Sequence, residues 1–242
     1  MIKTPPILVT GCPRSGTSII AAVLSQCGSF IGNITKRSMF ENCQIHDEVV
    51  KPYFMNMRVD WKGQYPLPDL NTISIPVDWK QKVEQIMLNQ GYESGSWMYK
   101  GTGMSLIWPV WAYAFPNAKW IIVRRRTVDI VQSCLKTGYM NAFSDEDVQS
   151  KVGVTSEKDG WLWWYHQHEK RFVEMITEGL NCKIIWPERM VNGDYQQLHE
   201  VLDWVGLPWK SEILNYIDPL LWSNKKGVKQ WQLEQHMMRY WK

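Results

Sequence analysis

The sequence predicts a three-layer α/β fold in which a central parallel sheet is flanked by helices. Short apolar runs that could form buried strands recur along the chain, at residues 7–10, 97–100, 119–124 and 182–186. Segments with helical periodicity lie between them, and buried strands that alternate with helices are typical of a parallel sheet covered on both faces. The 242 residues contain no composition shift that marks a linker, so we expect a single domain over residues 1–242.

The first run leads into a glycine-bearing loop and then into a helix. Over residues 17–26 the large apolar side chains fall on one helical face, and Cys27 and Gly28 supply a stop. Further helical patterns cover residues 79–89, 127–136, 158–178, 195–205 and 231–240. Another pattern, at residues 106–115, is interrupted by Pro109, because proline lacks the amide N–H that a helix interior needs.

One long segment has little periodicity. Residues 52–76 are rich in proline, tyrosine, asparagine and aspartate. We therefore expect residues 52–78 to form an insertion that covers either the substrate or the core.

The composition indicates a soluble globular protein and excludes several kinds of partner. The net charge is only +3 and no long run of basic residues occurs, so we expect no nucleic-acid partner. No apolar stretch reaches the ~18 residues of a membrane span, so we expect a cytoplasmic protein without a membrane partner. The five cysteines lack CxxC spacing and are expected as reduced thiols.

The many aromatic and histidine side chains are expected to pack rather than to bind ligands. We expect the fifteen tryptophans to pack mainly in the core. His166 and His168 share one predicted helix but have no third ligand at metal spacing, so no metal site is expected.

The loop after the first strand has the spacing of a phosphate-binding loop. Its G-x-x-x-x-G pattern lies between a strand and a helix, in the segment Gly11-Cys12-Pro13-Arg14-Ser15-Gly16-Thr17-Ser18. The backbone N–H groups of such a loop and the positive end of the helix dipole form a cradle for an anion. Gly16 allows close approach of the backbone, and Thr17 and Ser18 offer hydroxyls at the helix start.

One departure from a nucleotide-hydrolysing loop is informative. Such a loop has a lysine directly after the second glycine, where this chain has Thr17. The positive charge lies within the loop instead, at Arg14. The loop therefore suits an anionic ligand that has no γ-phosphate.

The string from Pro13 to Ser18 resembles the 5′-phosphosulfate loop of sulfotransferases that use 3′-phosphoadenosine 5′-phosphosulfate (PAPS), especially those of the bacterial and carbohydrate-type branch. The resemblance implies a P-loop-type fold, PAPS as the sulfuryl donor and 3′-phosphoadenosine 5′-phosphate (PAP) as the product. It also implies that residues 11–18 bind this cofactor.

A second segment is similar to the family's 3′-phosphate signature, in which a buried strand is followed by an arginine, an aspartate and a serine. Alignment on Asp129 and Ser133 places the family's arginine at Arg125 and implies that Arg125 and Ser133 hold the 3′-phosphate. A guanidinium fork and a hydroxyl suit such a dianion. The family's proline is replaced by Thr127, so Arg124 and Arg126 stay open as alternatives.

Two shorter resemblances complete the cofactor site. Lys100 corresponds to the lysine of the family's KDP strand end, although Gly101 and Thr102 replace the aspartate and proline. The segment with Lys225, Lys226 and Gly227 is similar to the basic segment that closes over the 3′-phosphate; a solvated basic turn is the alternative.

The resemblance also implies a catalytic base after the phosphate loop. Met39-Phe40-Glu41-Asn42 is similar to the bacterial pattern GYFE at a helix start, which makes Glu41 the candidate base. His46 and Asp47 remain alternatives. Arg14 and Lys100 are the candidates for stabilising the bridging oxygen of the leaving group.

We therefore expect a sulfotransferase that moves a sulfuryl group from PAPS to the hydroxyl or amine of a small-molecule or carbohydrate acceptor, without a metal. Two alternatives remain open. One is a small-molecule kinase with a P-loop, and the other is a module that binds PAP but catalyses nothing.

Overall fold

A computed structural model describes residues 1–34 and 39–217. Its centre is a four-stranded, wholly parallel sheet with the order β2-β1-β3-β4. The strands are β1 (Ile7–Gly11), β2 (Met98–Lys100), β3 (Lys119–Val123) and β4 (Cys182–Ile185). All four predicted strands are present, each within one residue of the expected ends, and the predicted fold class is confirmed.

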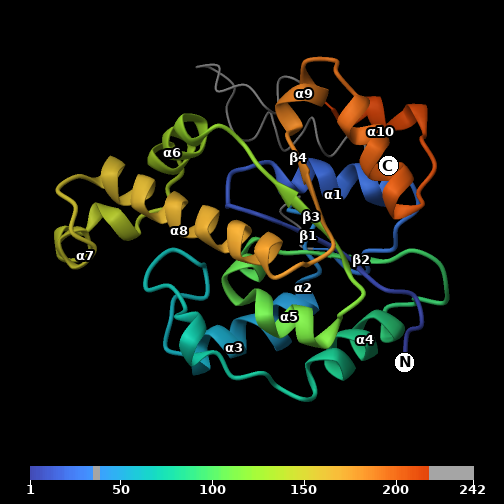
Figure 1. The fold of residues 1–242 in the computed structure, drawn as a ribbon, viewed down its shortest axis with the longest axis horizontal. Helices are drawn as coiled ribbons and strands as arrows, with labels where there is room; N and C mark the ends of the chain where they lie inside the picture. Colours follow the sequence, from blue (N-terminus) through green and yellow to red (C-terminus); the bar gives the residue numbers. More distant parts are fainter. Residues whose placement is uncertain (35–38, 218–242) are drawn as a thin grey trace.

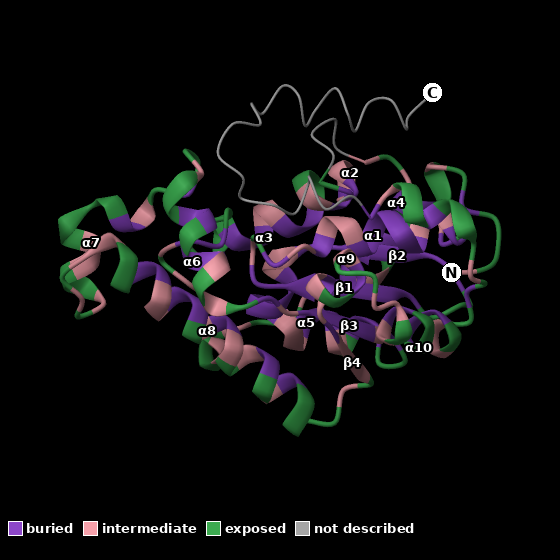
Figure 2. Cartoon of the chain, turned by 90° about the horizontal axis from the view of Figure 1, so that it is seen from above, coloured by how far each residue is buried: buried purple, intermediate pink, exposed green. Residues whose placement is uncertain are grey.

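The sheet is covered on both faces because neighbouring strand residues alternate in direction. Leu8, Tyr99 and Ile122 belong to one apolar cluster, whereas Val9 and Met98 belong to the other. In Figure 1, α1 (Thr17–Gln26), α9 (Pro187–Val191) and α10 (Gln196–Val205) lie on one side of the sheet. Figure 1 shows α3 (Lys51–Asn56), α4 (Trp79–Asn89) and α5 (Trp108–Ala114) on the other side. Coloured by burial, the strands are mainly purple and the outer helix surfaces mainly green (Figure 2).

Most predicted helices are found within a residue or two. The helix at residues 79–89 matches α4, and the helix at residues 127–136 matches α6 (Thr127–Lys136). The long helix α8 runs over Glu157–Thr177, and α7 (Glu146–Lys151) precedes it. Pro109 does not interrupt a helix as expected, because it lies in the first turn of α5, which starts at Trp108. Proline is tolerated in a first turn. The predicted helix at residues 231–240 lies outside the described residues.

The remaining elements are short. The candidate base region contains α2 (Cys43–Ile45), which continues as a π-helical turn, η1 (His46–Val50). Three 3₁₀ segments connect longer elements: η2 (Leu70–Thr72), η3 (Thr102–Ile107) and η4 (Ala142–Ser144). A fourth, η5 (Ser211–Asn215), follows α10.

The expected irregular insertion is helical at its start, since α3 reaches to Asn56. Beyond α3 the segment is irregular apart from η2, but it is firmly attached. Gln64 is buried; its side-chain amide donates to the carbonyl of Tyr139 at 2.8 Å and accepts from the N–H of Asn141 at 3.0 Å. Trp164 of α8 donates to the carbonyl of Gly63 at 2.8 Å.

The tryptophans among the described residues are mainly buried or packed against the apolar clusters, as predicted. The largest fully buried side chains include Trp97, Trp111, Trp120, Trp161 and Trp164. Trp61 is an exception and is 38% exposed. No helix among residues 1–34 and 39–217 is long and apolar enough to cross a membrane.

Candidate functional site

The candidate residues gather where the parallel strands end. Val9 of β1 is in register with Lys100 at the end of β2, and Gly11 is in register with Val123 at the end of β3. The carboxyl ends of parallel strands therefore share one edge, which is where open α/β sheets bind ligands. The phosphate loop, residues 101–102 and residues 124–126 all begin at this edge.

Two glycines, Gly11 and Gly16, allow the tight turn of the loop. A Cβ at Gly11 would lie 2.5 Å from the carbonyl oxygen of Val123 and 2.6 Å from Ser15 Oγ, so no larger residue fits. Gly16 has a φ of 96° and is the N-cap of α1. Arg14 also has a positive φ, 75°, which is costly for a residue with a side chain. The N–H of Ser15 donates to the carbonyl of Cys12 at 3.0 Å and closes the turn.

The polar groups of the loop fit an anion. Because its N-cap is a glycine, α1 has no side-chain cap. The N–H of Ile19 donates to the carbonyl of Gly16 at 3.2 Å, which leaves the N–H groups of Thr17 and Ser18 at the helix start for a ligand. Ser15 Oγ is buried without a hydrogen-bond partner among the described residues. Such an orphaned donor is costly unless a ligand or water satisfies it.

Two side chains of the loop region face away from such a ligand. The Cys12 side chain packs in an apolar cluster with Cys134 and Trp164, and burial raises the pKa of its thiol well above the usual range. Only its backbone can serve a ligand. The Ser18 hydroxyl donates to the carbonyl of Met39 at 3.1 Å.

Arg14 joins the loop to α6. Its Nε donates to Ser133 Oγ at 2.9 Å, and its Nη1 donates to the hydroxyl of Tyr139 at 3.4 Å. Arg125 Nη1 in turn donates to the carbonyl of Arg14 at 3.1 Å. Residues 14, 125 and 133, far apart in the sequence, thus form one connected group.

The three consecutive arginines have different environments. Arg124 forms an ion pair with Glu169 of α8. Arg126 is exposed and pairs with Asp129 at 2.8 Å. Arg125 is buried at the loop, and its burial lowers its pKa, against opposing effects of Asp129 and Glu188. Of the three, Arg125 has the hydrogen bond to the loop.

A second group surrounds Glu41. Lys100 Nζ lies 3.6 Å from Glu41 Oε2, and His46 Nδ1 lies 3.4 Å from Glu41 Oε1. The hydroxyl of Tyr99 donates to Glu41 Oε1 at 3.3 Å. Asn42, the next residue, caps α2 by accepting from the N–H of Ile45 at 3.1 Å. Glu41 therefore precedes the helix and lies outside its first turn.

The charges of this group support one another. Burial raises the pKa of the Glu41 carboxyl, but Lys100, His46 and Tyr99 outweigh it and leave the pKa lowered. Burial lowers the pKa of His46, but Glu41 and Asp47 leave it raised. Glu41 is therefore ionised at neutral pH. Asp47, the other candidate, is exposed and approaches only the far nitrogen of His46, at 3.9 Å.

Three residues of these groups were missed by the sequence interpretation: Tyr99, Tyr139 and Glu188. Glu188 accepts a hydrogen bond from the N–H of Arg126 and lies 4.0 Å from Arg125 Nε. No local pattern marks any of the three, since each is brought in by contacts between distant segments. Lys225, Lys226 and Gly227 lie outside the described residues.

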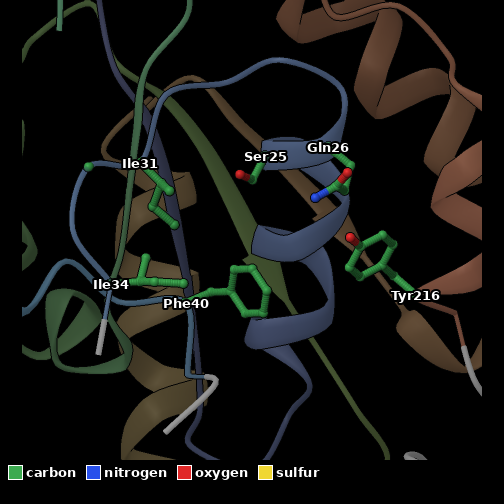
Figure 3. A pocket seen from close by; sticks show the side chains of 7 residues that line it. Ser25, Gln26, Ile31, Ile34, Phe40 and Tyr216 are labelled. Carbon is green, nitrogen blue, oxygen red and sulfur yellow. The ribbon is translucent and has the colours of Figure 1, made fainter. Parts of the chain in front are cut away.

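A cavity of about 250 Å³ lies beside α1, apart from both groups. Figure 3 shows Ile31, Ile34 and Phe40 on one side of the helix and Tyr216 on the other. Ser25 and Gln26, at the end of α1 opposite the loop, complete its wall with Gly32. None of the candidate residues lines this cavity.

Comparison with known proteins agrees with the fold. A model of the sulfotransferase family matches residues 5–211. The match to sulfotransferase STF9 from Mycobacterium avium covers 98% of this chain and 76% of STF9, with a TM-score of 0.53 and 12% identity. The sulfotransferase domain from the curacin biosynthetic pathway covers 96% and is covered to 82%, with a TM-score of 0.55 and 16% identity.

A third structure is the sulfotransferase domain from the Synechococcus PCC 7002 olefin synthase. It covers 100% of this chain and is covered to 96%, with a TM-score of 0.56 and 15% identity. At such identities the structures show a shared fold alone. No curated protein matches the sequence significantly.

Proposed function

This chain belongs to the sulfotransferase family, and from that premise we propose that it transfers a sulfuryl group from PAPS to a hydroxyl or amine of a small-molecule or carbohydrate acceptor. One observation carries the choice of donor. Arg14 of the phosphate loop, Arg125 after β3 and Ser133 of α6 form a single hydrogen-bonded group. That group supplies cationic and hydroxyl hydrogen-bond donors next to a loop that suits an anion. A ligand with phosphate groups at two separate positions, such as PAPS, requires both.

In this proposal, residues 11–18 hold the 5′-phosphosulfate. The uncapped N-terminus of α1 and the orphaned Ser15 hydroxyl supply donors at the loop. Arg125 and Ser133 hold the 3′-phosphate. Arg124 is committed to Glu169, and Arg126 is exposed and paired with Asp129, which favours Arg125 over its neighbours.

Lys100 is proposed to stabilise the leaving group. It is buried at the end of β2, and its ammonium already faces Glu41 at 3.6 Å. PAPS supplies the sulfuryl group: the acceptor oxygen bonds to sulfur, the bond from sulfur to the bridging oxygen breaks, and PAP leaves. A buried cation near that bridging oxygen opposes the negative charge that develops there.

Glu41 is proposed to accept the proton of the acceptor. Its lowered pKa keeps it ionised, and its contact with Lys100 places it beside the proposed leaving-group cation. An acceptor hydroxyl that reaches Glu41 is therefore close to the transferred group. His46 lies 3.4 Å from Glu41, and its raised pKa favours the imidazolium, which stabilises the Glu41 carboxylate.

The proposal differs from a kinase in ways that can be measured. Binding is tested by thermal unfolding with PAP, 5′-AMP, and ATP with Mg²⁺. A ligand at ~100 times its dissociation constant raises the free energy of unfolding by about 2.7 kcal/mol. PAP should therefore raise the melting temperature well above the value measured with 5′-AMP. Equal shifts from PAP and 5′-AMP, or a larger shift from ATP with Mg²⁺, contradict the choice of donor.

Catalysis is tested separately with ³⁵S-labelled PAPS and a panel of hydroxyl and amine acceptors. Transfer of label to an acceptor, absent with heat-treated protein, is the expected result. PAP binding with no transfer to any acceptor and no release of PAP from PAPS favours the inactive module instead.

A further inference from the structure

Trp61 stands out among the large aromatic side chains beside the proposed base. It is 38% exposed, and its ring meets the His46 ring edge-on at 5.7 Å. His46 contacts Glu41 on its other side, at 3.4 Å. Only one side chain therefore separates this exposed indole from the proposed base.

Two lysines are arranged around the same ring. Lys51 Nζ, from the start of α3, lies 4.5 Å from the centre of the Trp61 ring, and Lys62 Nζ lies 5.9 Å from it. Neither lysine forms an ion pair with a carboxylate within the described part of the chain. A cation held over an indole face by cation–π attraction keeps its charge available to an anion.

The backbone that presents Trp61 is fixed. The Asp60 carboxylate accepts from the N–H of Lys62 at 3.1 Å and from the N–H of Gln64 at 2.9 Å. The N–H of Gly63 donates to the carbonyl of Asp60 at 2.9 Å. The buried Gln64 then anchors the turn to Tyr139, whose hydroxyl accepts from Arg14. Residues 60–64 thus connect the Glu41 group to the phosphate loop.

Two carboxylates, Asp60 and Asp47, lie near this turn, and within the described residues neither forms an ion pair with Lys51 or Lys62. Asp60 is engaged by backbone N–H groups of its own turn. Asp47 is exposed and lies 3.9 Å from His46 Nε2. Lys62 on this rigid turn and Lys51 at the start of α3 thus place two lysines without a carboxylate ion pair next to the proposed base. Such charges can select an oppositely charged substrate.

We propose that Lys51 and Lys62, held by Trp61, bind an anionic group of the acceptor, a carboxylate or sulfate carried near the hydroxyl that faces Glu41. This inference rests on the proposed function, because it assumes that Glu41 receives the acceptor hydroxyl. It deepens that function by assigning the acceptor to the acidic hydroxyl compounds, acidic saccharides among them.

The test uses three probes that share one ring: glucose, glucuronate and glucose 6-sulfate. PAP-loaded protein is titrated with each probe and binding is followed by saturation-transfer NMR. Wild type should bind both anions more tightly than glucose. Loss of one exposed ion pair is worth roughly two- to fivefold in affinity, so Lys51→Gln with Lys62→Gln should remove most of the preference.

Lys82→Gln is the matched control, because Lys82 is an exposed lysine that pairs with Asp78 on α4, outside this group. It should leave the preference unchanged. Equal binding of the three probes to wild type overturns the proposal, and so does a double variant that keeps the preference.

The proposed function and the anion preference are tested by separate measurements. PAP binding is measured first on every variant and should not change, since neither lysine belongs to the cofactor groups. If wild type does not bind PAP, the choice of donor is wrong, and the titrations are repeated without PAP to decide the anion preference alone.

Discussion

Arg14 Nε donates a 2.9 Å hydrogen bond to Ser133 Oγ across 119 positions of the chain. The bond connects the phosphate loop to α6, where the proposed 3′-phosphate site lies. Because Ser133 accepts this bond, its hydroxyl hydrogen is still available to donate to a phosphate. A direct hydrogen bond therefore connects the two proposed ends of the cofactor site.

Arg125→Gln should weaken PAP binding far more than 5′-AMP binding. A hydrogen bond to a charged group is worth about 1.5–3 kcal/mol, or roughly ten- to 150-fold in affinity. Isothermal calorimetry with both ligands measures this difference. Arg126→Gln is the control, since Arg126 is 71% exposed and bonds to Asp129. If Arg126→Gln lost more PAP affinity than Arg125→Gln, the assignment of the 3′-phosphate arginine would have to change.

Arg14→Gly and Arg14→Ala should have similar effects on PAP binding but different effects on the free energy of unfolding. Both remove the guanidinium and should weaken PAP binding to a similar extent. The φ of 75° at this position suits glycine, so the glycine variant should be more stable than the alanine variant by ~1 kcal/mol. Urea unfolding and calorimetry give the two quantities. An alanine variant as stable as the glycine variant would show that the loop relaxes out of this conformation.

Glu41→Gln should abolish most turnover while leaving the cofactor bound. Removal of a general base slows catalysis by ~10²–10⁴-fold, and glutamine keeps the shape of the side chain. PAP affinity should stay near that of wild type, because Glu41 contacts Lys100, His46 and Tyr99 rather than the phosphate loop. Release of PAP from PAPS serves as the assay until an acceptor is known.

His46→Ala is the comparison for that variant. It removes the imidazole beside Glu41 but leaves the carboxylate and Lys100, so the loss of turnover should be smaller. Full activity in Glu41→Gln together with none in His46→Ala would make His46 the base instead.

His168 should make the protein less stable in mild acid. It is fully buried, and burial lowers its pKa to about 3. Below pH ~6.5 this histidine is protonated in the unfolded chain but stays neutral in the folded chain. Its contribution to the free energy of unfolding is therefore fully present above pH ~6.5 and is lost as the pH falls towards 3. Between pH 7 and 5 the loss from this residue is about 2 kcal/mol.

His168→Phe tests this pH dependence. Ser105 Oγ lies 3.2 Å from His168 Nδ1 and also donates to the carbonyl of Thr102, so the serine keeps a partner in the variant. Denaturant unfolding at pH 7 and pH 5 should show a smaller difference for the variant than for wild type. Equal pH dependence in the two proteins would contradict the assignment.

PAP binding and turnover should survive EDTA. The kinase-type lysine is replaced by Thr17, and the proposed charge stabilisation comes from the side chains of Arg14, Arg125 and Lys100 rather than from a metal ion. Melting temperatures with PAP, measured with EDTA and with added Mg²⁺, should agree. A loss of binding in EDTA that Mg²⁺ restores would favour the kinase alternative.

Local patterns in the sequence predicted the strands, most helices and the glycine-bearing loop between β1 and α1. Hydrophobic periodicity records which side of each segment is buried, so the bounds of α4 and α6 could be predicted from the chain alone. Gly11 and Gly16 were equally predictable, because their spacing between a strand and a helix serves one backbone geometry. The helix α3 (Lys51–Asn56) was missed, since the proline and tyrosine at its beginning suggested irregular structure.

The spacing to Asp129 and Ser133 already favoured Arg125, but only the tertiary structure shows how the environments of Arg124, Arg125 and Arg126 differ. Only the tertiary structure brings Glu41 against Tyr99, Lys100 and His46. The environments of the three arginines differ because Glu169 of α8 pairs with the first, the phosphate loop accepts a bond from the second, and the third reaches solvent. Such selection depends on partners far along the chain, which a local pattern of side-chain polarity does not encode.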